Sequence, residues 1–236
     1  MSTILDKAAE GIQHWNQAHQ NSEATLQYFN QGVFFEFTPQ QYEVWKGIYQ
    51  TLSEEEQQNF EIHAYLCLNP NANKNLELSI YAVDSYTDSL EVSTHQNNYL
   101  KALQHIPYLN TLQHLNAANT SEQNNRRNSI NPQEALERCM AWNLYKNTWI
   151  PTQTNLVRVF RIPFQDFTNL FELANATIAI APLALQATNE NGYEIELILW
   201  GQNQENAILW QYPEDFIEPC PPLCDSSFSL LEYANG

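Results

Sequence analysis

The chain has 236 residues, of which 43% are hydrophobic and 12% aromatic, so it can bury a sizeable core and global disorder is not expected. Its formal charge of −17 reflects a shortage of Lys and Arg, 10 in total, against 27 Asp and Glu. Binding to nucleic acid or to an anionic membrane needs clustered Lys and Arg, so we expect neither partner. The sequence has no signal-peptide pattern and no apolar run of ~18 residues, so we expect a cytoplasmic location.

The first 60 residues predict a helix, a short strand and two further helices. Apolar residues at helical spacing predict a helix over about 3–19, and a short apolar run predicts a strand over 33–37. Residues 38–41 then form a capping-box signature with proline at the first helical position, and residues 53–56 repeat that spacing. A longer helix and a shorter one should therefore follow the strand.

A β-hairpin is predicted next, with strands over 61–68 and 76–83 joined by an Asn-rich turn. On the second strand Tyr81 and Val83 make the outer face partly apolar. We therefore expect a helix or a partner to cover that end of the strand.

The middle of the chain predicts a helix over 95–116, a polar linker over 116–131 and a helix over 132–147. In the last helix Glu134 and Arg138 form an i, i+4 pair. Its large apolar residues lie on one stripe, namely Leu136, Met140 and Leu144.

The last third repeats the earlier order of elements. We expect a strand near 156–162, a helix near 165–174 and hairpin strands over 177–185 and 193–200, with a further strand over 207–212. Because Pro182 cannot donate to a ladder, its strand should be an edge strand or carry a bulge.

An internal repeat organises these predictions. Residues 62–84 match residues 179–201 without a gap, with identities at Ala64/Ala181, Leu66/Leu183, Leu68/Leu185 and Glu77/Glu194. The sequence thus predicts an α+β fold of internally duplicated βαββ units, forming a mostly antiparallel sheet, or two abutting sheets, with helices largely on one face. The halves span 1–115 and 132–236, joined by the linker at 116–131, and together they should form one compact domain.

The densest motif for chemistry is Cys220 and Cys224 within a Pro-rich segment. Two cysteines four residues apart are typical of half a metal site, but no second pair of ligands accompanies them. A structural Pro-rich tail and a disulfide are the alternatives.

Acids and histidines elsewhere give weaker signals. Asp84 and Asp88 bracket a strand end, where turn chemistry explains them as well as a site would. His63 and Cys67 are four apart on a strand, too far to share one ion. The histidines are interpreted as surface or capping residues, and Cys67 as a small core residue.

Because no catalytic or cofactor-binding constellation emerges, we expect a non-catalytic protein-binding module of inhibitor, immunity or adaptor type, with no cofactor. Trp200, Trp210 and Tyr212 are candidate interface residues, although they could equally be core. The alternative is a small-molecule or metal-dependent enzyme with a site between the halves, where Glu77 and Glu194 are the symmetric acidic pair. The sequence leaves a homodimer open.

Overall fold

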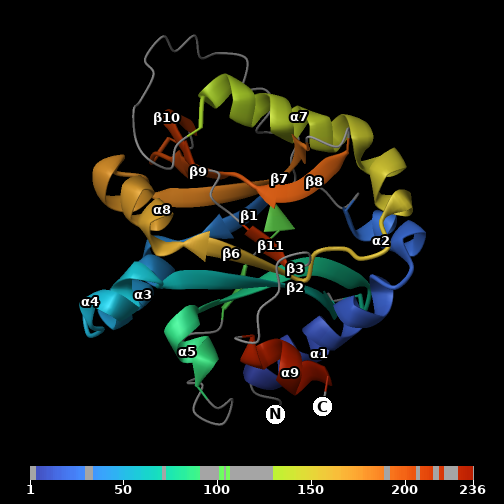
Figure 1. Cartoon of the computed structure of the whole chain (residues 1–236), viewed down its shortest axis with the longest axis horizontal. Helices are drawn as coiled ribbons and strands as arrows, with labels where there is room; N and C mark the ends of the chain where they lie inside the picture. The colour runs from blue at the N-terminus through green and yellow to red at the C-terminus, as the bar shows by residue number, and fades with distance from the viewer. Residues whose placement is uncertain are drawn as a thin grey trace.

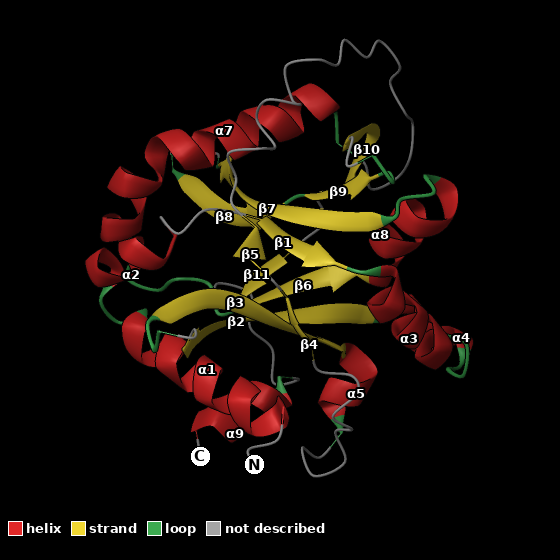
Figure 2. Ribbon diagram, turned by 180° about the vertical axis from the view of Figure 1, so that it is seen from behind, coloured by secondary structure: helices red, strands yellow, loops and turns green. Residues whose placement is uncertain are grey.

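The computed structural model describes residues 4–29, 34–70, 73–90, 101–103, 105–106, 130–188, 192–205, 208–214, 218–220 and 228–235. Two antiparallel sheets face each other in the middle of the molecule, with helices outside them (Figures 1 and 2). One sheet, called the β2 sheet, has the order β11 (Glu218–Cys220), β6 (Val159–Pro163), β2 (Glu61–Pro70), β3 (Leu76–Asp84) and β4 (Lys101–Leu103). The other, called the β7 sheet, has the order β10 (Ile208–Glu214), β9 (Leu199–Gln202), β7 (Ile178–Ala187), β1 (Phe34–Phe37) and β5 (His105–Ile106), and β8 (Tyr193–Leu197) also pairs with β7.

Helices cover the outer faces of both sheets. The β2 sheet is covered by α1 (Ile4–Ala18) and α9 (Ser229–Asn235), and the β7 sheet by α7 (Pro132–Trp149) (Figure 2). The remaining helices are α2 (Ser22–Phe29), α3 (Pro39–Tyr49), α4 (Glu54–Gln58), α5 (Ser85–Ser89) and α8 (Phe164–Thr168), which continues as a π-helical segment over Asn169–Leu173. Among the described residues, no helix has the length and hydropathy that a bilayer crossing requires.

The expected α+β class is confirmed, and the strands form two sheets, but helices cover the outer face of each sheet and not mainly one face. The reason is that β2 and β7 are buried on both faces along most of their length. One face of each strand packs in the core between the sheets, with Phe35, Phe37, Leu66, Leu68, Phe160, Ile162, Leu183 and Leu185. The opposite face needs its own cover, which α1 and α9 supply on one side and α7 on the other.

The short strands β1 and β6 each pair with a hairpin from the other end of the chain. Phe35 of β1 lies opposite Ala181 of β7, and Phe160 of β6 lies opposite Ala64 of β2. Two positions further along each strand, Phe37 pairs with Ala179 and Ile162 pairs with Ile62. The two ladders therefore tie the segments before and after the middle of the chain into one body.

Local signals predicted most elements well. Both capping boxes form, with the Thr38 side chain accepting from the Gln41 amide and the Ser53 side chain accepting from the Glu56 amide. The hairpin β2–β3, the first helix and the capped start of α7 at Asn131 also match their predicted positions.

The helix predicted over 95–116 is wrong where the structure describes it. Residues 101–103 form β4 beside β3, and residues 105–106 form β5 beside β1. Pairing to the open edges of both sheets overrides the helical spacing of the leucines. Most of the predicted helix, and the linker to residue 129, lie outside the described residues.

Pro182 lies on a central strand, not an edge. Strand β7 pairs with β9 up to Ile180 and with β8 from Leu183 onward. Pro182 occupies the break between these two partners, where its missing N–H costs no ladder bond on that side.

Candidate functional site

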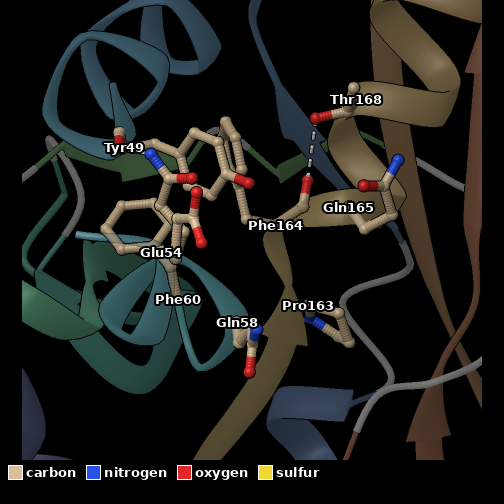
Figure 3. A pocket seen from close by; sticks show the side chains of 9 residues that line it. Tyr49, Glu54, Gln58, Phe60, Pro163, Phe164, Gln165 and Thr168 are labelled. Carbon is tan, nitrogen blue, oxygen red and sulfur yellow. Dashed lines mark hydrogen bonds between the residues drawn. The ribbon is translucent and has the colours of Figure 1, made fainter. Parts of the chain in front are cut away.

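A pocket opens between the segment from the end of α3 to the start of β2 and the start of α8, and we call it the α4–α8 pocket (Figure 3). Its volume is about 620 Å³, within the usual range for ligand sites. Residues 49–60 line it from the first half and residues 163–168 from the second. The lining residues are Tyr49, Glu54, Gln57, Gln58, Phe60, Pro163, Phe164, Gln165 and Thr168.

Aromatic rings form one wall of this pocket. The ring centroid of Tyr49 lies 4.9 Å from that of Phe164, and Phe60 meets Phe164 edge-on at 5.2 Å. Local sequence places these rings, because α3 ends at Tyr49, the capping box at Ser53 turns the chain into α4, and β2 begins just after Phe60. Phe164 opens α8 directly after Pro163 ends β6.

The polar lining is partly engaged within the protein. Gln57 Nε2 donates to the carbonyls of Tyr49 (2.9 Å) and Leu52 (3.2 Å). Thr168 Oγ1 donates to the Phe164 carbonyl at 3.4 Å, as Figure 3 shows. None of the residues described as lining this pocket is a His, Cys, Lys or Arg.

A second polar group, the His63 cluster, lies beside α9, with its His63, Tyr65 and Asp88 side chains buried. It comprises Glu61, His63 and Tyr65 of β2, Asp88 of α5 and Arg161 of β6. Alternate residues of a strand point to one face, which places the three β2 side chains in a row.

Both ring nitrogens of His63 meet carboxylates. Nδ1 lies 2.5 Å from Asp88 Oδ2, and Nε2 lies 3.0 Å from Glu61 Oε1, which also accepts from Arg161 Nε at 2.7 Å. Burial alone would lower the pKa of His63, but hydrogen bonds to Asp88 and Glu61 outweigh it and raise the pKa to about 9. His63 is therefore a charged imidazolium, and the cluster balances two cations against two carboxylates.

The C-terminal helix closes over this cluster. Ser229 Oγ donates to Asp88 Oδ1 (3.1 Å) and to the Asp88 carbonyl, while the Leu230 N–H donates to Asp88 Oδ1 (3.4 Å). The ring of Phe228 lies 4.7 Å from that of His63. Since His63 is 1% exposed and both its N–H groups are engaged, the cluster holds α9 in place and offers no free base.

The interpretation of lone histidines as surface or capping residues is thus wrong for His63. The signal that sequence reasoning missed is the alternation of Glu61, His63 and Tyr65 on a predicted strand, which puts titratable groups on one face. The turn interpretation holds for Asp84, which caps α5 by accepting from the Thr87 N–H at 2.8 Å.

Of the two candidate metal-binding cysteines, Cys220 lies among the described residues. Cys220 is buried and disulfide-bonded, so in this state it has no thiolate for a metal, and Cys224 lies outside the described residues. Cys67 and Cys139 form no disulfide and are buried, as small core residues are. Within the described parts of the chain, no group of three or more His, Cys, Asp or Glu is arranged to hold a metal ion.

Of the three predicted interface residues, the structure describes the side chain of Trp200 alone. Trp200 is 2% exposed and packs with Phe34 and Ile180 beneath α7, so it serves the core. Trp210 and Tyr212 lie on β10, but their side chains are outside the described set. Glu77 lies on β3 and Glu194 on β8, in different sheets, so the structure does not place them at one site.

Helix α7 turns most of its predicted apolar stripe outward. The side turned to the β7 sheet uses Ala135, Cys139 and Trp142. Of the predicted stripe, Met140 is 46% and Leu144 66% exposed, and only Leu136 is half-buried. The stripe is therefore present, but it does not face the core.

Comparison of the chain with protein-family models, with curated proteins and with solved structures gave no significant match.

Proposed function

We propose that the protein acts by non-catalytic binding of another protein, which inserts a side chain into the α4–α8 pocket. The observation that carries this proposal is the pocket itself, which is open, aromatic on one wall and built from both halves. Its one acidic lining residue, Glu54, has no paired nucleophile among the described lining residues, because the Thr168 hydroxyl is directed to a backbone carbonyl. This favours recognition over chemistry.

The net charge supports a basic partner. A formal charge of −17 attracts cationic proteins at long range and raises their association rate at low salt. An inhibitor, immunity or adaptor role fits such a partner. The cytoplasmic location expected from the sequence stays a prediction, and the disulfide at Cys220 weighs against it, since stable disulfides are typical of oxidising compartments.

We also propose that the two halves are a duplicated βαββ unit whose first strands are exchanged. Two facts support it: β1 joins the later hairpin while β6 joins the earlier one, and Phe35–Ala181 has its counterpart in Phe160–Ala64. In this arrangement the helices that follow the exchanged strands meet at the α4–α8 pocket, which explains why both halves line it.

A pocket-filling variant tests the binding function. Gln58 is exposed and lines the pocket, so Gln58→Trp should obstruct it, whereas Gln13→Trp on α1 adds the same ring elsewhere. Proteins crosslinked in a lysate of the source cells should include some that wild type and Gln13→Trp recover but Gln58→Trp does not. Identical recovery with all three proteins would refute binding through this pocket.

A small-molecule enzyme is the second candidate, and the observation that favours it is the position of the pocket between the halves. Its volume of about 620 Å³ suits a small metabolite. A compound that is turned over by wild type and by Gln13→Trp, but not by Glu54→Gln, would support this candidate over the first.

A further inference from the structure

We propose that the α4–α8 pocket recognises a guanidinium group, which an arginine side chain of the basic partner supplies. This inference rests on the proposed function, because it names the group that would enter the same pocket. It is argued from three properties of the lining: the hydrogen-bonding groups left free, the aromatic wall and the charge.

Several donors among the amide and hydroxyl groups of the lining are engaged within the protein, whereas the Gln58 amide and the Tyr49 hydroxyl make no hydrogen bond with the described residues. Both N–H bonds of Gln57 are directed to backbone carbonyls, so its carbonyl oxygen remains. Gln165 Nε2 donates to Asn169 Oδ1 at 3.0 Å, and the Asn169 amide in turn donates to Glu214, which fixes the orientation of Gln165. The Thr168 hydroxyl proton is also engaged. These groups leave acceptor oxygens on Gln57 and Thr168 for a ligand, and the Gln58 amide offers both donors and an acceptor.

Glu54 adds a charged acceptor to this set. Its carboxylate is exposed on α4 and makes no hydrogen bond or ion pair with the described residues, unlike that of Glu56, which the Ser53 capping box holds. No cation among the described lining residues neutralises it. A positively charged ligand with several donors therefore suits Glu54 and the neighbouring acceptor oxygens best.

The aromatic wall selects among such cations. The half-buried ring of Tyr49 lies beside Glu54 (Figure 3), backed by Phe60 and Phe164, which are 5% and 4% exposed. A guanidinium is planar, carries five N–H donors and stacks on aromatic rings, whereas an ammonium is a compact, strongly hydrated point charge. An anion would meet Glu54 and the acceptor oxygens without compensation.

The test uses the intact protein and two matched probes, N-acetyl-arginine amide and N-acetyl-citrulline amide, which differ in charge at nearly equal shape. Their binding is followed by backbone amide shifts of ¹⁵N-labelled protein. The arginine probe should give saturable shifts at Gln58, Phe60 and Gln165, with a Kd on the order of millimolar for a single group. The citrulline probe should give none at the same concentration.

Charge variants then separate the pocket from the overall charge. Glu54→Gln should weaken the arginine probe by about two- to five-fold, as expected for a partly exposed ion pair. Glu23→Gln, at an exposed position of α2, changes the net charge equally and should leave the Kd unchanged. Equal shifts with both probes, shifts confined to other surfaces, or equal effects of the two variants would each overturn the inference.

The outcomes distinguish the two proposals. If pocket-dependent proteins are captured but the arginine probe does not bind the pocket, the guanidinium inference fails and the binding function stands. If the arginine probe binds the pocket but no pocket-dependent protein is captured, the site takes a free guanidinium compound and the protein-binding function fails.

Discussion

Replacing His63 with Gln tests whether the buried imidazolium stabilises the fold. In the folded protein Asp88 and Glu61 raise the pKa of His63 to about 9, against 6.5 for an ordinary histidine. One unit of pKa corresponds to about 1.4 kcal/mol, so this difference is equivalent to about 3 kcal/mol of the free energy of unfolding. The side chain is 1% exposed, so solvent screening takes little from this value.

The sign follows from proton binding. Below pH 6.5 both the folded and unfolded states hold the proton, and the stabilisation is complete. Between pH 6.5 and 9 only the folded state keeps it, so stability should fall by up to about 1.4 kcal/mol per pH unit. Above pH 9 the contribution of His63 is lost.

Urea unfolding followed by tryptophan fluorescence at pH 6, 7.5 and 9 measures this dependence. Between pH 6 and pH 9 the free energy of unfolding of wild type and of a His14→Gln control should fall by about 3 kcal/mol through the deprotonation of His63. His63→Gln should lack this fall. Burial raises the pKa of the Cys67 thiol, but Cys67 titrates alike in all three proteins and cancels in the comparison. Parallel pH dependences for wild type and His63→Gln would refute a charged, stabilising His63.

Two further pairs of substitutions test the packing. Gly11→Ala would place a Cβ 2.7 Å from the Asn69 side chain and should cost about 1–3 kcal/mol, whereas Gly47→Ala, with no atom within 4 Å, should stabilise by about 0.5–1 kcal/mol. Urea midpoints that shift alike for both would contradict this close contact of α1 with β2. On α7, Trp142→Ala should cost about 3–5 kcal/mol and Leu144→Gln less than about 0.5 kcal/mol. A large loss for Leu144→Gln would show that the outward stripe is buried in solution.

Local sequence determined the elements whose stability is local. The capping boxes at Thr38 and Ser53 and the cap at Asn131 predicted helix starts, because the side chain and the amide it accepts from are two or three residues apart. The apolar residues of 61–68 and 76–83 predicted a hairpin, because the two strands that pair are separated only by a short turn in the sequence. The match between 62–84 and 179–201 also led to the idea of two related halves.

Only the tertiary structure decided which partners these elements take. Nothing near Phe35 in sequence indicates that it pairs with Ala181, and nothing near residues 101–106 indicates strands that complete two sheet edges. The same holds for the sites. His63 gains its charge from Asp88, 25 residues away, and the α4–α8 pocket exists because residues near 55 and 165 meet in space. Periodicity and capping report interactions within a few residues, whereas pairing, burial and electrostatics depend on the whole packed chain.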